Sequence, residues 1–460
     1  MKIQLRIDNF KVYDMIIIPS VVIGAIFIGT ILQLFGPTRY TTKTECAYKC
    51  NDNSMNEYDV NNCQGIDPNS GETFYFNFER LDSMNRYTKL YFIPYLHKNY
   101  IDNYHSSFLY LEINTNLTLS YREKGTWNYW EGGEFNTSLK CYNGGNGECG
   151  IVQWINEPYI MQKEQRMEVT IQGPKNVISN ICLMQVYGSK SYSTMRIVYN
   201  IILTIICSGY IIYYFIYLII KRIYPRDLDK QQYLNIGLMI FGLVYNDPLD
   251  LLSLAISSAF FPIFHGIMNI LFLGYLVFFI TAFFQSIRIE EGILLNKKVE
   301  WIVIVLSTLI MMFSFSFSAS VYLKGMTDNP FSVTKPTTTV AVLFYVISVI
   351  SATVIFVWII FIFFTSYKTI KRQENIRKGL YFCLGSFLVI GLEFFMLLMS
   401  DYSSFFSTTF TSEIIIFGIN AYFFVMFYGF VPTFASTFDE VIIGPDNQDD
   451  STRPILFDMK

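Results

Sequence analysis

Residues 197–220 read IVYNIILTIICSGYIIYYFIYLII and contain no charged side chain. A helix needs roughly 20 apolar residues to cross a bilayer, so this stretch predicts a transmembrane helix. Similar charge-free runs occur at Met15–Phe35, Trp301–Leu323 and Ile414–Phe438. The 460 residues are 52% hydrophobic and 15% charged, against about 25% charged in a typical soluble domain. We therefore expect a multi-pass membrane protein, which excludes a disordered chain, a fibrous protein and an ordinary cytosolic enzyme.

Four further spans complete the expected set. Leu251–Ile287 and Pro336–Tyr367 are longer, and each has room for one helix and a short loop. Tyr233–Ile256 is interrupted by Asn246-Asp247-Pro248, and Gly379–Met399 contains Glu393. One span therefore precedes a long hydrophilic segment, and seven spans follow it. The expected division is 1–36 (N-terminus and signal-anchor helix), 37–196 (lumenal or extracellular domain), 197–434 (seven-helix core) and 435–460 (acidic tail).

The positive charges predict the orientation. Lys and Arg concentrate in cytosolic loops of membrane proteins. Fifteen of them fall in segments 1–12, 221–232, 288–300 and 368–378, whereas the short loops on the other side hold Lys324 and Lys335. Both termini are therefore expected in the cytosol. The first span has a basic leader and no small-x-small cleavage site, which favours an uncleaved signal anchor over a signal peptide.

The hydrophilic segment has the features of an oxidising compartment. Its six cysteines are expected to form three disulfides, with the pairing open: Cys46, Cys50, Cys63, Cys141, Cys149 and Cys182. Both glycosylation sequons, at Asn116 and Asn136, lie in the same segment. We expect no metal site around Cys46, Cys50 and Cys63, because no histidine is near them in sequence.

Short aromatic or β-branched runs predict a β-sandwich in this segment. The predicted strands are Thr73–Phe78, Thr88–Ile93, Phe108–Ile113, Leu117–Tyr121, Met167–Ile171 and Asn180–Val186. Turn signals separate them, among them Gly132-Gly133 and Gly173-Pro174. Trp127, Trp130 and Trp154 are expected in the core rather than on a binding surface.

Polar residues inside the helical core are the candidate ligand-binding site, because ionisable groups at membrane depth are costly. The candidates are Asp247, Asp250, His265, Asn269, Glu393 and Asn420. With the serines at 314, 316, 318 and 320, they fall in the lumenal half of the predicted helices, and the cytosolic half has little beyond Thr281 and Gln285. This one-sided polarity predicts a lumen-facing vestibule lined by Asp247 and Glu393, rather than a conduction pathway. Three of these residues also have a structural explanation: a helix end or kink at Asp247-Pro248, a protonated Glu393 hydrogen-bonded to a neighbouring helix, and a structural hydrogen bond from His265.

Catalytic and cofactor motifs are missing from the sequence. An intramembrane zinc enzyme needs several ligands around one metal, and His265 is the only histidine in the predicted bundle. The last span has no lysine for retinal, and the chain has no phosphate-binding glycine loop, nucleophile elbow or HExxH motif. We expect no enzymatic activity, no metal and no cofactor. The net charge of −3 gives no argument for nucleic-acid binding.

Three strings in the core carry a resemblance to a known family. They are Leu243-Val-Tyr-Asn-Asp-Pro-Leu249, Gln285-Ser-Ile-Arg288, and Tyr422-Phe-Phe-Val-Met-Phe-Tyr428 before Pro432. Together with the layout, they resemble the Wntless-like membrane proteins, which combine a lumenal GOLD-type domain with seven helices. The closest branch is the transmembrane protein 181 family. The resemblance implies a GOLD-like β-sandwich on a GPCR-like bundle in the secretory pathway, and a role in receiving or escorting cargo.

Two functions compete. The first is a cargo or sorting receptor of the Golgi, endosome or plasma membrane, which binds a secretory or membrane protein or a lipid ligand through the β-domain and vestibule. The second is a signalling receptor whose basic loop Lys368–Lys378 contacts a cytosolic transducer. Gln285-Ser-Ile-Arg288 lacks the acidic-Arg-aromatic triplet common in rhodopsin-like receptors, which favours the first. A channel or transporter is disfavoured by the one-sided polarity.

Overall fold

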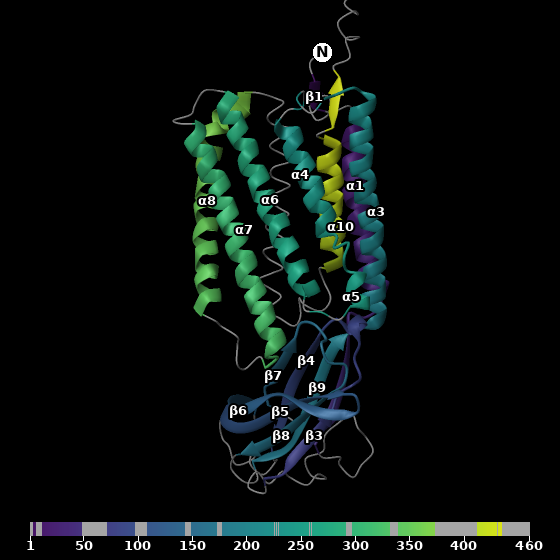
Figure 1. Cartoon of the computed structure of the whole chain (residues 1–460), viewed down its shortest axis with the longest axis vertical. Coiled ribbons are helices and arrows are strands. Elements are labelled where there is room, and N and C mark those ends of the chain that lie inside the picture. Colours follow the sequence, from purple (N-terminus) through teal and green to yellow (C-terminus); the bar gives the residue numbers. More distant parts are fainter. Residues whose placement is uncertain are drawn as a thin grey trace, which may run out of the picture.

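The structure, a computed structural model, describes residues 3–5, 12–47, 71–96, 108–142, 149–172, 177–224, 226, 228, 230–256, 258, 260–290, 297–331, 339–372, 412–429 and 431–434. Its helices stand side by side in a bundle, and its two larger sheets form a β-domain at one end of that bundle (Figure 1). The expected combination of a β-domain with membrane helices is therefore confirmed.

Seven of the eight expected spans contain helices in the described residues: α1 (Val12–Phe35), α3 (Lys190–Ile220), α4 (Lys230–Tyr245), α6 (Phe260–Glu290), α7 (Lys297–Asp328), α8 (Thr339–Arg372) and α10 (Ser412–Gly429). The span 379–399 lies outside the described residues. Among the described helices, α3, α6, α7 and α8 are long and apolar enough to cross a membrane. The apolar parts of α1 and α10, Ile16–Leu32 and Ile416–Gly429, are shorter.

The Asn246-Asp247-Pro248 string ends helix α4, as one sequence interpretation expected. The helix stops at Tyr245, and a turn then leads into the short helix α5 (Leu252–Ala255). Pro248 has no backbone N–H and disfavours helical backbone in the residue before it. Asp247 itself takes a positive φ of 49°, a conformation that Asp adopts more readily than most residues. The chain therefore changes direction where the polar residues lie.

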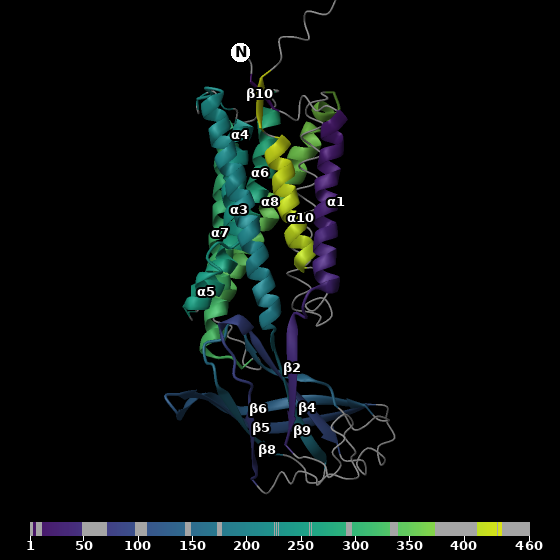
Figure 2. The same ribbon diagram turned by 90° about the vertical axis from the view of Figure 1, so that its right-hand side faces the viewer.

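Helix α6 forms the centre of the bundle. Its side chains Phe272, Phe279 and Phe284 are nearly or completely buried. They pack with residues of α4, α7, α8 and α10 in one apolar cluster. Helix α1 packs against α10, and α3 packs against α4. Seen from the side, α10 lies between α3 and α1 (Figure 2).

The last helix is shorter than expected. The predicted span continued to Phe438, but α10 ends at Gly429 because glycine and a following proline, Pro432, end helices readily. The chain then forms strand β10 (Pro432–Phe434), which pairs antiparallel with β1 (Ile3–Leu5). The two ends of the described chain therefore meet at the end of the bundle away from the β-domain (Figure 1).

The β-domain is a sandwich of two four-stranded antiparallel sheets, as expected. Its strands are β2 (Tyr40–Cys46), β3 (Thr73–Asn77), β4 (Thr88–Leu96), β5 (Phe108–Glu123), β6 (Thr126–Tyr142), β7 (Val152–Glu157), β8 (Gln165–Gln172) and β9 (Ile178–Gly188). The sheet orders are β2-β9-β4-β7 and β3-β8-β5-β6. Inward side chains from both sheets, such as Phe92, Leu117 and Trp154, form one apolar core.

The predicted strands differ from the observed ones in three ways. Strands β2, β6 and β7 were not predicted, and the runs at 108–113 and 117–121 form the single strand β5. The turn expected at Gly132-Gly133 is wrong, because both glycines lie inside β6. A Cβ on Gly132 would stand 2.6 Å from the carbonyl oxygen of Leu117. This glycine therefore permits a close approach to β5 rather than a turn.

Two of the three expected disulfides are formed, Cys46–Cys182 and Cys141–Cys149. Cys50 and Cys63 lie outside the described residues, so their pairing stays a prediction. The tryptophan prediction holds for Trp154, which is fully buried and stacked on Phe92.

The other two tryptophans are less buried. Trp130 is partly buried against the core. Trp127 is exposed, with Arg166 lying over its ring, so its assignment to the core was wrong.

Candidate functional site at the junction of the two domains

A chain of three polar side chains lies at the end of the bundle next to the β-domain. An Asp247 carboxylate oxygen is 3.0 Å from His265 Nδ1, and His265 Nε2 is 3.2 Å from the Asn269 side-chain amide. The side chain of Asp247 is 13% exposed and that of His265 is 33% exposed. We call these three residues the Asp247 cluster. Its partial exposure leaves it open to a polar group of a ligand.

Local structure explains how these residues meet. The turn after α4 presents Asp247, whereas His265 and Asn269 lie near the start of α6. Residues four apart share one face of a helix, so His265 and Asn269 both face the same neighbour. An unpaired carboxylate at this depth would be costly, and the imidazole offsets part of that cost.

Next to this cluster, Asn246 and Asn420 join α4 to α10. Each side-chain amide donates to the carbonyl oxygen of the other, at 2.8 and 2.9 Å. The Asn420 amide also donates to the Ile416 carbonyl oxygen at 2.9 Å. Asn246 is 3% exposed, so this pair fixes two helices to each other inside the bundle. Sequence analysis selected Asn420 but not Asn246, although Asn246 stands beside Asp247 in the quoted string.

Asp250 forms a different contact from the vestibule lining that was expected. Both of its carboxylate oxygens accept hydrogen bonds from Arg86 of the β-domain, at 2.6 and 3.1 Å. Arg86 also donates to the Ser253 hydroxyl at 2.8 Å. Through this pair, Asp250 joins the helix bundle to the β-domain. No sequence pattern indicated this pair, whose residues are separated by 164 positions.

A short helical turn positions Arg86. Asp82 and Asn85 form a capping box at the start of the 3-10 helix η2 (Ser83–Asn85). The Asn85 amide donates to the Gly188 carbonyl oxygen at the end of β9, and Lys190 at the start of α3 pairs with Asp82 at 2.8 Å. Arg86 then follows with a φ of 63°. The arginine is therefore held on a rigid support at the junction.

A second contact across the junction comes from Tyr159. Its hydroxyl donates to the Ile256 carbonyl oxygen at 3.3 Å and accepts from the Ser258 backbone N–H at 3.1 Å. The segment that carries Tyr159 is fastened by Glu157, which accepts from the Met161 backbone N–H at 2.9 Å and from the Gln165 amide at 2.7 Å. Burial raises the pKa of Glu157 to about 7, although its hydrogen bonds act in the opposite direction.

The contact also extends to the far side of the junction. The Asn156 backbone N–H donates to the Pro330 carbonyl oxygen after α7, at 2.9 Å, and Phe331 packs into the sandwich core. The β-domain is thus attached to the segment before α6 and to the end of α7.

Further charge lies close to the Asp247 cluster. Arg196 on α3 is near enough to Asp247 and Asp250 to attract them electrostatically. Its Nε is buried without a hydrogen-bond partner. The junction therefore contains two arginines, Arg86 and Arg196, and two aspartates, Asp247 and Asp250.

The remaining predicted residues divide into three groups. Glu393 lies outside the described residues, so the vestibule it was expected to share with Asp247 stays a prediction. Ser314 and Ser320 donate to carbonyl oxygens of their own helix, a structural role. Asn116 and Asn136 are exposed on the neighbouring strands β5 and β6, where attached glycans would have room.

The prediction that the half away from the β-domain has little polarity beyond Thr281 and Gln285 is wrong. At the opposite end the buried side chains of Gln232, Asn235, Gln285 and Glu300 lie within α4, α6 and α7. The Gln285 amide donates to Glu300 at 2.5 Å, whereas neither polar atom of the Asn235 amide has a hydrogen-bond partner. The sequence missed Gln232 and Glu300 because α4 and α7 begin before the predicted spans.

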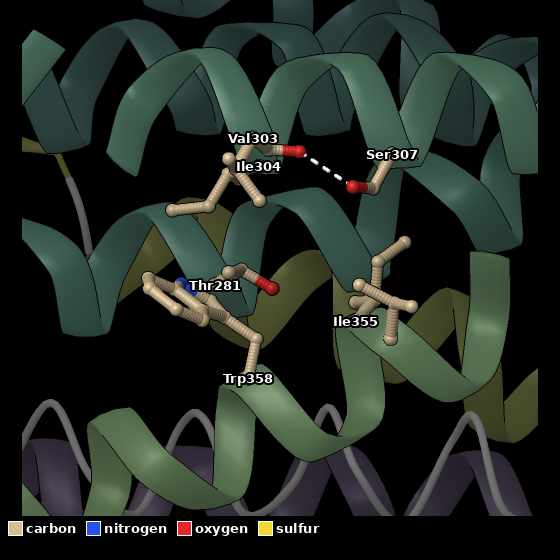
Figure 3. A pocket seen from close by; sticks show the side chains of 7 residues that line it. Thr281, Val303, Ile304, Ser307, Ile355 and Trp358 are labelled. Carbon is tan, nitrogen blue, oxygen red and sulfur yellow. Dashed lines mark hydrogen bonds between the residues drawn. The ribbon is translucent and has the colours of Figure 1, made fainter. Parts of the chain in front are cut away.

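Cavities provide a separate test of where a ligand fits. A small one of about 10 Å³ lies between α6, α7 and α8 (Figure 3). Trp358 and Thr281 lie beside each other in it, and the Trp358 indole N–H has no partner. This volume is near the minimum for one water molecule. It is too small for a larger ligand and lies away from the Asp247 cluster.

The fold and the junction define a class: a multi-pass membrane protein with a β-sandwich docked on a helix bundle. The chain also matches the Wntless-like transmembrane domain over residues 189–434. It therefore belongs to the Wntless-like family, as the sequence strings implied. A comparison with curated proteins found no significant match.

Proposed function

We propose that this protein is a non-enzymatic receptor of the secretory pathway that binds cargo or ligand for trafficking or sorting. Its family membership supports a secretory-pathway membrane protein. The observation that carries the receptor role is the partly exposed Asp247 cluster, set beside the β-domain at the end of the bundle. Assignment to the transmembrane protein 181 branch and a GOLD-like identity of the β-domain belong to the same proposal.

The junction supports binding that involves both domains. The β-domain is fastened to the bundle through Arg86 and Tyr159, so its position over the Asp247 cluster is fixed. A ligand held by the β-domain would therefore meet the cluster in a reproducible geometry. Preorganisation of this kind gives affinity without a large rearrangement.

The test compares Asp247→Asn with Asp328→Asn, an exposed aspartate at the same end of the bundle. Asparagine keeps the size and hydrogen-bonding capacity of Asp247 but removes its charge. Each variant is purified from cells in mild detergent, and the proteins and lipids that co-purify are quantified by mass spectrometry. We expect Asp247→Asn to lose at least one co-purifying species by about tenfold, equal to about 1.4 kcal/mol. Equal recovery from both variants and the wild type contradicts the proposal.

Folding must be checked separately, because Asp247 also ends α4. Asn is a good residue for this backbone position, so the thermal midpoint of Asp247→Asn should stay close to that of the wild type. Pro248→Ala provides the opposite control, since it alters the chain direction without removing the charge. Loss of ligand in Pro248→Ala alone would assign the string a structural role only.

A signalling receptor is the second candidate, and the buried polar groups at the other end of the bundle favour it. Asn235 and the Gln285–Glu300 pair lie where a transducer would contact a GPCR-like bundle. Steady-state location discriminates the two: cycling through the Golgi and endosomes supports sorting, and stable surface display supports signalling. Ion or solute flux in reconstituted vesicles tests the channel class, since the one-sided polarity no longer argues against it.

The proposed topology places the β-domain in the lumen and both termini in the cytosol. Asn116 and Asn136 should then carry glycans, because both are exposed on the β-domain. Glycosidase treatment should shift the mobility of the wild type and not of an Asn116→Gln, Asn136→Gln double variant. A tag after residue 460 that resists protease in sealed microsomes contradicts this orientation.

A further inference from the structure

An apolar groove is lined mainly by α1 and α3, which form its walls, and by α10, which forms its floor. Figure 2 shows α10 between these two helices. Its volume is about 390 Å³, within the range of small-molecule sites. Its lining includes Gly24, Ala25, Cys207, Tyr210, Asn420 and Phe424. Asn420 contributes its only amide side chain. The groove is therefore distinct from the Asp247 cluster. It shares Asn420 with the Asn246–Asn420 pair next to that cluster.

Small residues of α1 give the groove its width. Gly24 and Ala25 stand where the helix faces the groove, and a Cβ on Gly24 would meet no atom within 4 Å. The opposite surface is aromatic, with the Tyr210 ring 5.2 Å from that of Phe424 and 5.3 Å from that of Phe427. The groove thus has open space beside α1 and a packed aromatic surface on α3 and α10.

Paired strands hold the walls in place at both ends. Helix α1 continues through Gly36 into β2, and β9 leads into α3. Strands β2 and β9 pair over their full register, with the Cys46–Cys182 disulfide between them. At the far end, β1 before α1 pairs with β10 after α10. These links fix α1 relative to α3 and α10, so the groove is a built feature of the fold.

We propose that this groove binds one acyl chain of a bilayer lipid. The floor runs from Phe417 to Phe427, a helix rise of about 15 Å at about 1.5 Å per residue. The hydrocarbon core is about 30 Å thick, so the groove has the length of one leaflet. The Asn420 amide already donates to Asn246 and Ile416, which leaves the apolar surface to determine the ligand.

Dispersion contacts explain why an acyl chain would bind in this groove rather than elsewhere on the lipid-facing surface of the bundle. The chain gains no hydrophobic free energy on leaving the surrounding lipid, so affinity comes from close packing. The aromatic floor and the two walls contact a chain on three sides, whereas a flat helix surface contacts it on one. The bound chain also fills the open space beside Gly24. This proposal is independent of the receptor function.

The test uses a phosphatidylcholine with a diazirine in one acyl chain. The full-length protein is reconstituted into phosphatidylcholine vesicles containing this probe, irradiated and digested, and the labelled peptides are identified by mass spectrometry. Gly24→Leu fills the groove. Gly209→Leu is the matched control, since Gly209 is an exposed helix glycine of α3 outside the groove, also with no atom within 4 Å of a Cβ. Gly24→Ala, which adds one methyl group, gives an intermediate step.

We expect groove-lining peptides of α1, α3 and α10 to be labelled at least fivefold more per residue than the exposed faces of α7 and α8. Gly24→Leu should reduce this labelling at least fivefold, Gly24→Ala less, and Gly209→Leu should leave it unchanged. Equal labelling in all four proteins, or groove labelling no higher than on α7 and α8, overturns the proposal. Cross-links from the groove to another polypeptide in native membranes would assign it to a protein partner instead.

Discussion

Arg86 of the β-domain donates two hydrogen bonds to the carboxylate of Asp250, which belongs to the turn between α4 and α5. The side chains are 23% and 13% exposed. Removing one partner of such a largely buried pair is costly, because it leaves the other charge uncompensated. Together with the contacts of Tyr159 and Asn156, this pair holds the β-domain on the bundle.

The first prediction concerns this ion pair. Asp250→Ala should destabilise the protein by about 3 kcal/mol, because Arg86 is then left without its carboxylate. The double variant Arg86→Met, Asp250→Ala should be no less stable than Asp250→Ala alone. Thermal unfolding in detergent measures the relative stabilities of the wild type and these variants. Glu164→Ala is the control, since its pairs with Arg80 and Arg122 are longer and more exposed, at 3.4 and 3.5 Å. Its loss should stay below about 1 kcal/mol. Additive effects of the two junction changes would contradict the coupling.

The second prediction concerns Asn246 and Asn420. Asn420→Leu should destabilise the bundle by about 2 kcal/mol, because the Asn246 amide then loses both of its bonds to Asn420 in a buried site. The double variant with Asn246→Leu should recover part of this loss, since no unsatisfied amide remains. Thermal midpoints of the two single variants and the double variant provide the measurement. A double variant that unfolds earlier than both single variants would contradict this account.

The third prediction concerns pH. Glu157 has a folded pKa of about 7, above the ordinary value of 4.5. The folded state therefore binds the proton more tightly than the unfolded state. The contribution of Glu157 to stability is therefore greatest below about pH 4.5, falls as the pH rises to about 7 and levels off above that. The contribution of this one group is about 3 kcal/mol, at 1.36 kcal/mol per pKa unit.

Glu157→Gln isolates this contribution, because glutamine is neutral at every pH. Between pH 5 and pH 7.5, the thermal midpoint of full-length Glu157→Gln should rise relative to that of the wild type. A constant difference over this range would contradict the raised pKa. Glu168→Gln, at a more exposed carboxylate of β8 paired with Arg166, serves as the matched control.

The fourth prediction concerns the disulfides. Non-reducing peptide mapping should find Cys46–Cys182, Cys141–Cys149 and a third bridge between Cys50 and Cys63, with Cys207 alkylated as a free thiol. Cys207 is buried inside the bundle and unbridged among the described residues, so it is an internal control. Loss of the Cys46–Cys182 bridge should cost about 2–5 kcal/mol, because it links distant parts of the chain. Free thiols at Cys50 and Cys63 would contradict the third bridge.

Sequence patterns predicted the helices well because the bilayer imposes a length and an apolar composition on each of them. The break at Asn246-Asp247-Pro248 was also predictable, since proline acts locally. Strand β6 was missed for the opposite reason. Gly132 and Gly133 are typical turn residues, and only the close approach of β5 explains their place in a strand.

Side-chain partners at the junction could be predicted only in part. The depth of Asp247 and His265 followed from helix rise, and the two do meet. The partner of Asp250 could not be predicted, because Arg86 is distant in sequence and depends on the whole sandwich for its position. Glu300 was missed because α7 begins a few residues before the predicted span. A carboxylate assigned to a loop is therefore a buried residue of the helix.

The packing of α1 on α10 has a consequence for biogenesis. Among the described helices, the N-terminal one, α1, packs mainly against the C-terminal one, α10, and strand β1 cannot pair with β10 until β10 has been made. The helices are inserted in order during synthesis. While the intervening residues are translated, α1 therefore stays in the membrane near the translocon without α10. Lipid or a chaperone then covers the surface of α1 that α10 will contact. Ribosome-bound intermediates truncated before residue 412 should accordingly be the most sensitive to quality-control degradation.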